Sequence, residues 1–77
     1  MPPQHTYEVQ PPTGVDQEIA SHGVNVDKLV REAIGYLDDG NTDIDELAIA
    51  RMFIERGHSE DLAHWLVREA EVRRAPR

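Results

Sequence analysis

Apolar residues recur at helical spacing in the second quarter of the chain. Between residues 26 and 37 they fall three and four positions apart, which is the spacing of one buried stripe on a helix. Asn25 precedes the stripe as the expected N-cap, and Gly40 follows it as the residue expected to end the helix. The stripe consists of Val26, Leu29, Val30, Ala33, Ile34 and Leu37, with Tyr36 at its edge. The pattern predicts a first amphipathic helix.

A second helix is predicted to begin in the acidic turn DDGNTDIDE at residues 38–46. Asp43 as N-cap and Glu46 three residues later match a capping box, and Asp45 adds negative charge near the positive helix end. Gly57 is expected to end this helix.

The apolar side chains of this second helix cover an unusually wide arc. Between residues 47 and 54 only Arg51 is polar, and at about 100° per residue the apolar positions sweep roughly 220°. In one interpretation the helix is the central element of a three-helix domain and packs on two neighbours. One side would then be Leu47, Ala50 and Ile54, and the other Ile49, Met52 and Phe53. In the second interpretation two short helices leave part of the arc uncovered, as a binding groove or a homodimer face.

A third helix is predicted after Gly57. Ser59 is its expected N-cap, with Glu60 and Asp61 in the first turn. Its apolar stripe is Leu62, Ala63, Leu66, Val67 and Ala70. Trp65 falls outside that stripe, and Pro76 ends any helix, so residues 74–77 are expected to fray.

The N-terminal region has a different composition. Residues 1–14 hold two Pro-Pro pairs and little apolar material, which is typical of a disordered arm that stays solvated or orders on a partner. Val15 and Ile19, four positions apart, allow a short helical turn from Asp16 to Ser21 before Gly23 breaks it. The sequence thus predicts an all-α protein with a flexible Pro-rich arm (1–23), a three-helix domain (24–73) and a frayed tail (74–77).

Composition supports one small domain and limits the chemistry. The chain has 77 residues, of which 39% are apolar and 30% charged, so there is room for a single core. It contains no cysteine, which excludes disulfides and zinc sites built on thiolates. We find no signal-peptide pattern and no apolar run long enough to span a membrane, and we therefore expect a cytoplasmic protein without a membrane partner.

The net charge of −7 is unevenly distributed. Residues 24–50 carry seven acidic against two basic side chains, whereas residues 51–77 carry six arginines against five acids. Such a surface repels phosphate backbones over most of its area, so nucleic acid is not the expected partner. A basic or apolar protein partner fits better.

No catalytic, cofactor or metal motif is complete. Asp39, Asn41, Asp43 and Asp45 alternate like calcium ligands, but Ile44 stands where the loop needs Gly and Ala50 where it needs Glu. The four histidines, His5, His22, His58 and His64, form no HxxxH or HExxH pair. The only serines, Ser21 and Ser59, lie at a break and a cap, and provide no catalytic triad. We expect no metal, no cofactor and no enzymatic activity.

Two nucleic-acid-related alternatives are open. The second and third predicted helices have helix-turn-helix proportions. The recognition helix would then begin with Ser59, Glu60 and Asp61, and its acidic side chains would repel the DNA phosphates. The acidic side chains concentrated around residues 38–46 allow the alternative of an acidic nucleic-acid mimic that inhibits a basic target. A helix-turn-helix DNA-binding regulator and a mimic therefore stand beside the main interpretation.

The main interpretation is a non-enzymatic interaction or regulatory module (an adaptor, small subunit or inhibitor) that binds a protein partner, or a second copy, through an apolar patch with an acidic rim. The predicted partner-binding residues are Trp65, Phe53, Met52, Ile49 and Tyr36. The predicted rim is Asp38, Asp39, Asp43, Asp45 and Glu46. For Trp65 an alternative is that it closes the edge of the core against the N-terminal arm.

Overall fold

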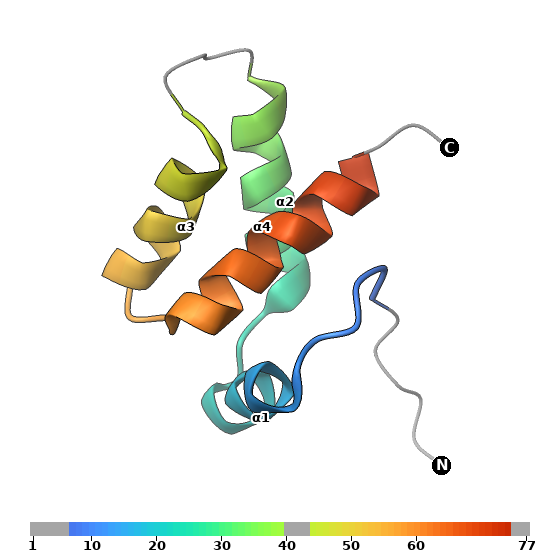
Figure 1. The fold of residues 1–77 in the computed structure, drawn as a ribbon, viewed down its shortest axis with the longest axis vertical. Helices are drawn as coiled ribbons and strands as arrows, with labels where there is room; N and C mark the ends of the chain where they lie inside the picture. Colours follow the sequence, from blue (N-terminus) through green and yellow to red (C-terminus); the bar gives the residue numbers. More distant parts are fainter. Residues whose placement is uncertain (1–6, 40–43, 75–77) are drawn as a thin grey trace.

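A computed structural model describes residues 7–39 and 44–74 of the chain, and within them every regular element is a helix (Figure 1). The helices are α1 (Thr13–His22), α2 (Val26–Asp38), α3 (Glu46–Glu55) and α4 (Glu60–Arg74). The predicted all-α class is therefore confirmed. The described residues contain four helices, where the sequence predicted three and a short additional turn.

The additional helix, α1, lies in the region predicted as a flexible arm. It has ten residues, longer than the expected turn, and it buries Val15 and Ile19 in the core. Gly23, with φ +62°, ends it in the left-handed conformation that glycine adopts without strain. The helical domain thus begins at residue 13 instead of 24, while residues 1–6 of the predicted arm lie outside the described residues.

The helix starts follow local capping signals. Asn25 Oδ1 accepts the Lys28 N–H at 3.1 Å, and Ser59 Oγ accepts the Leu62 N–H at 3.1 Å, which confirms both predicted N-caps. For α3 the predicted cap is corrected by two residues, since Asp45 Oδ1 accepts the Ala48 N–H at 2.8 Å. Asp43 and Gly40 lie outside the described residues.

The central helix is α4, not the second predicted helix. In Figure 1 α4 crosses the middle of the molecule, with α3 beside it, α2 behind it and α1 below. Helices α1, α2 and α3 all pack on α4, whereas α2 and α3 share few contacts. Most of α4 is consequently buried: Leu62, Ala63, Trp65, Leu66, Val67, Glu69 and Ala70.

This arrangement tests the interpretation of α3 as the central helix that packs on two neighbours. Ile49, Ala50 and Phe53 face the core and are at most 2% exposed. Leu47 is 66% exposed and Ile54 36% exposed, so Leu47 lies largely outside the packing of the helices and Ile54 is only partly covered. The interpretation of α3 as a central element is therefore wrong, because α4 occupies that place and α3 lies at the side of the fold.

Candidate functional site

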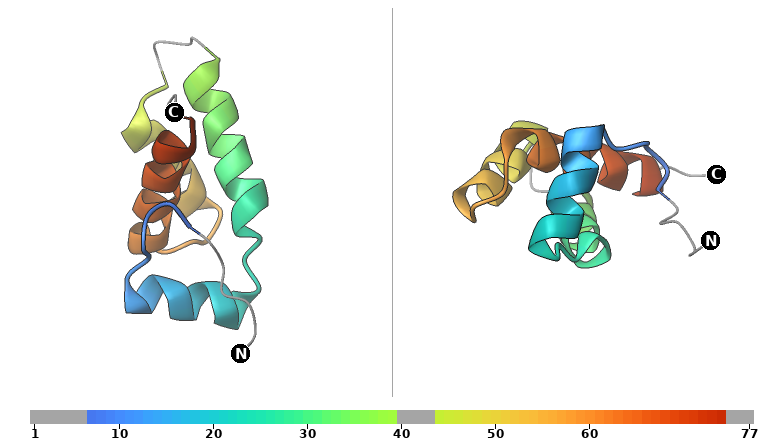
Figure 2. Two further views of the ribbon diagram at one scale, coloured as in Figure 1. Left: turned by 90° about the vertical axis from the view of Figure 1, so that its right-hand side faces the viewer. Right: turned by 90° about the horizontal axis from the view of Figure 1, so that it is seen from below.

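Trp65 is buried beneath residues 7–12, which we call the arm segment. The indole is 5% exposed, its Nε1–H donates to the Val9 carbonyl at 3.0 Å, and the Tyr7 ring meets it edge-on at a centroid distance of 4.9 Å. Figure 2 shows the chain N-terminal to α1 turning back over α4. Trp65 thus closes the core against the arm segment, as in the alternative interpretation, and does not present a free surface.

Glu69, which the sequence analysis did not identify, anchors the same segment. Its carboxylate is fully buried, and Oε1 accepts the Val9 N–H at 2.8 Å while Oε2 accepts the Glu8 N–H at 3.0 Å. Oε2 also accepts from Arg73 Nε at 2.8 Å, and Arg73 Nη1 reaches Asp27 on α2 at 3.2 Å. A buried carboxylate is stable only when its oxygens are satisfied in this way. The sequence signal that could have identified Glu69 is its position three residues after Leu66, on the same side of the helix as the apolar stripe.

The other predicted partner-binding residues do not gather into one patch. Ile49 and Phe53 are core residues, and Met52 and Tyr36 are half-buried at its edge. Phe53 also lies 5.7 Å from the Arg56 guanidinium carbon. Of the five, none belongs to the exposed apolar surface of the described residues.

The predicted acidic rim is partly occupied by internal contacts. Asp38 accepts from Arg74 Nε at 2.8 Å, and Asp45 caps α3. Glu46 hydrogen-bonds Glu71 and thereby raises the pKa of Glu71 above its ordinary value. Asp39 is exposed at the end of α2, and Asp43 lies outside the described residues.

The exposed apolar surface that the structure offers is on α3. Leu47, Arg51 and Ile54 fall within about 60° of one another at 100° per residue, and we call them the α3 outer face. Leu47 is the most exposed large apolar side chain among the described residues, at 66%. Val72, which is 38% exposed, belongs to a different helix, α4. Glu46 and Glu55 flank this face along the helix.

Neither a metal cluster nor a membrane-spanning helix is found in the described part of the chain. Within residues 7–39 and 44–74 no three side chains of His, Cys, Asp or Glu group together as ligands. Each helix there is too short or too polar to cross a membrane. Comparisons of the chain with protein-family models, with curated proteins and with solved structures found no match.

Proposed function

We propose that this chain is a non-enzymatic protein–protein interaction module whose contact surface is the α3 outer face. The observation that carries the proposal is the 66% exposure of Leu47, in a helix whose opposite side fills the core with Ile49 and Phe53. Folding alone gives no reason for a large apolar side chain at this position, since α4 covers only one side of α3. An apolar side chain on an exposed helix face is a common contact in helix-mediated recognition.

The surrounding charge indicates the chemistry of the partner. Glu46 and Glu55 flank the face, Asp45 precedes it, and the chain carries a net charge of −7. An apolar surface with basic residues at its edges, such as a basic amphipathic helix, complements both the apolar side chains and the acidic surroundings. The proposal thus keeps the predicted combination of an apolar patch with an acidic rim, on a different set of apolar residues.

The arginine pairings support a protein partner over nucleic acid. Arg73 bonds Glu69 and Asp27, Arg74 bonds Asp38, and both would have to leave these acids to reach phosphates. Glu60 and Asp61 are exposed in the first turn of α4, where a recognition helix would approach DNA. These contacts weigh against the helix-turn-helix alternative.

The test compares Leu47→Ser with Val72→Ser, a matched apolar-to-polar change at an exposed site on another helix. A photo-crosslinker at Ala48 identifies the partner in cells, and calorimetry with the purified partner gives the affinities. Burying a leucine contributes about 1.5–3 kcal/mol, so Leu47→Ser should weaken binding by roughly 10- to 100-fold while Val72→Ser changes it little. Both variants should keep the helical circular dichroism of the parent, because surface substitutions shift stability by only about 0.5 kcal/mol.

Three results would contradict the proposed contact surface or partner. Equal loss of affinity in both variants, or none in Leu47→Ser, would remove the α3 outer face from the interface. Recovery of nucleic acid instead of protein would favour the helix-turn-helix alternative. A dimer in sedimentation that dissociates in Leu47→Ser would replace the separate partner with a second copy of the chain.

A further inference from the structure

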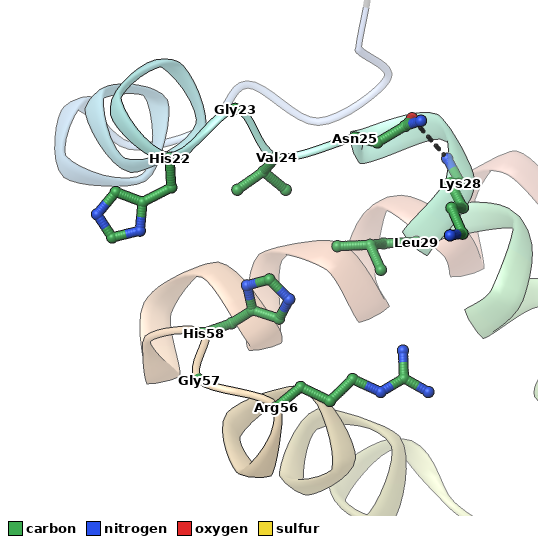
Figure 3. A pocket seen from close by; sticks show the side chains of 9 residues that line it. All are labelled: His22, Gly23, Val24, Asn25, Lys28, Leu29, Arg56, Gly57 and His58. Carbon is green, nitrogen blue, oxygen red and sulfur yellow. Dashed lines mark hydrogen bonds between the residues drawn. The ribbon is translucent and has the colours of Figure 1, made fainter.

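A cleft lies where the turn between α1 and α2 meets the turn between α3 and α4. It is lined by residues 22–25, Lys28, Leu29 and residues 56–58, and encloses about 390 Å³, within the size range of small-molecule sites. We call it the turn cleft. Figure 3 shows Lys28, Arg56 and His58 around the space next to Leu29, with His22 at the opposite edge.

The side chains that line the turn cleft are basic, in a chain that is acidic overall. Lys28, Arg56 and two histidines, His22 and His58, are among its nine lining residues, and none of the nine is Asp or Glu. The whole chain has 15 acidic residues against 8 lysines and arginines. The histidines, which are far apart in the sequence and form no motif there, are brought to one cleft by the fold.

Contacts behind the cleft hold its walls in place. Glu18 on α1 accepts hydrogen bonds from the Ser59 N–H at 3.1 Å and from the Ser59 hydroxyl, which ties α1 to the turn between α3 and α4. Glu32 on α2 accepts from both terminal nitrogens of Arg56, one of them at 3.0 Å. Phe53 meets the His58 ring edge-on at 6.3 Å, so the side chains at this wall are positioned before any ligand arrives.

These supporting carboxylates also set the charge balance. The Ser59 hydrogen bonds lower the pKa of Glu18, and the hydrogen bonds from Arg56 lower the pKa of Glu32, so both stay ionised in mildly acidic solution. Their two negative charges offset Lys28 and Arg56. Arg56 keeps three of its five N–H donors for a ligand, because Glu32 uses two.

We propose that the turn cleft binds a small phosphate monoester, with the phosphate held by Lys28, Arg56 and the imidazole of His58. The donors come from α2 and from the α3–α4 turn, and so approach from different directions. A tetrahedral phosphate offers acceptors in several directions, whereas a carboxylate offers two oxygens in one plane. The remaining volume, beside the apolar side chains of Val24 and Leu29, accommodates a small organic group.

The test is an NMR titration of the ¹⁵N-labelled full chain at constant ionic strength. The probes are glycerol 3-phosphate, inorganic phosphate and citrate, all titrated at the same pH. We expect saturable shifts centred on the amides of residues 22–29 and 56–58. Glycerol 3-phosphate should bind more tightly than citrate. Comparison with inorganic phosphate separates recognition of the organic group from recognition of phosphate alone.

Matched charge-removing variants locate the site. Lys28→Gln and His58→Gln should each weaken binding of glycerol 3-phosphate by about fivefold or more, while Arg68→Gln on the exposed side of α4 changes it by less than about twofold. Arg56 is left intact, because its removal would also break the pair with Glu32. Shifts that do not saturate, equal effects of all three variants, or tighter binding of citrate would overturn the proposal. Leu47→Ser should leave these titrations unchanged, so the cleft and the α3 outer face are tested separately.

Discussion

Replacing Glu69 with glutamine tests the anchor of the arm segment directly. The carboxylate is fully buried and accepts three hydrogen bonds, from the N–H groups of Glu8 and Val9 and from Arg73. Glutamine keeps the shape but has one acceptor oxygen and one NH₂ donor. If its oxygen replaces Oε2 it still accepts two of these bonds, and its NH₂ group then faces the Val9 N–H, donor against donor.

The expected destabilisation follows from counting these bonds. A hydrogen bond to a charged group contributes about 1.5–3 kcal/mol, and a charge-assisted bond is about twice as strong as a neutral one. Glu69→Gln loses one bond and weakens two, while an amide is easier to bury than a carboxylate. We therefore expect the free energy of unfolding to fall by about 2–4 kcal/mol. A domain of this size has a total of only about 4–12 kcal/mol, so the effect is large.

Urea unfolding measures the effect with two probes. Circular dichroism follows the helices, and the fluorescence of Trp65, the only tryptophan, follows the arm segment that covers it. The variant should show a red-shifted native emission, because release of the arm segment exposes the indole. Glu71→Gln is the control: it is the same change two residues later, at a carboxyl that faces Glu46. It should leave stability unchanged or raised, and equal midpoints with unchanged emission in the two variants would refute the reasoning.

Three further predictions concern other parts of the fold. Phe53→Ala should lower the free energy of unfolding in urea by about 3–5 kcal/mol, because the ring is fully buried; a loss below 1 kcal/mol, typical of surface sites, would contradict this placement. The hydrogen bond from Arg56 lowers the pKa of Glu32, so the pair stabilises the fold at pH values above 4.5, the ordinary pKa of a glutamate. This stability is lost as the pH falls through the lowered pKa of the folded state. Arg56→Gln should therefore flatten the acid limb of a plot of urea midpoint against pH. A parallel downward shift of that plot would show that the pair is not the cause. Gly57→Ala should destabilise by about 1–3 kcal/mol, since φ is +107°, whereas Gly35→Ala inside α2 should stabilise by about 0.5–1 kcal/mol; thermal unfolding of both variants shows whether the signs differ.

Local signals in the sequence predicted the parts of the fold that depend on neighbours in the chain. Asn25 and Ser59 were identified as N-caps because each such cap involves residues only three positions apart. The cap of α3 was placed two residues early, since Asp43 and Asp45 are equally suitable by residue type. The apolar stripes of α2 and α4 likewise followed from spacing within each helix.

Burial that arises from distant segments was not predictable in this way. The Trp65 indole bonds to a residue 56 positions away, and Glu69 bonds to residues 60 and 61 positions away. Helix α1 contributes only two buried apolar side chains, Val15 and Ile19, which is little periodicity to detect. Such a short helix is marginal in isolation and depends on packing against α4.

The two candidate sites also depend on contacts between segments that are distant in the sequence. The sequence identified an arc on α3 too wide for one neighbour, but the crossing of the helices determines that Leu47 and part of Ile54 remain exposed. The turn cleft joins residues that lie more than 25 positions apart, so His22 and His58 could only be read as scattered. Identification of both sites therefore required the packing of α4 against its neighbours.

The central position of α4 has a consequence for how the chain folds as it is synthesised. Helices α1, α2 and α3 leave the ribosome before α4, the helix on which all three pack. Until residues 60–74 emerge, the earlier helices have few contacts with one another, and helices of 10 to 13 residues are marginal in water without a partner. We therefore expect the nascent chain to remain protease-sensitive until α4 is free, and to acquire its protected core in one step thereafter.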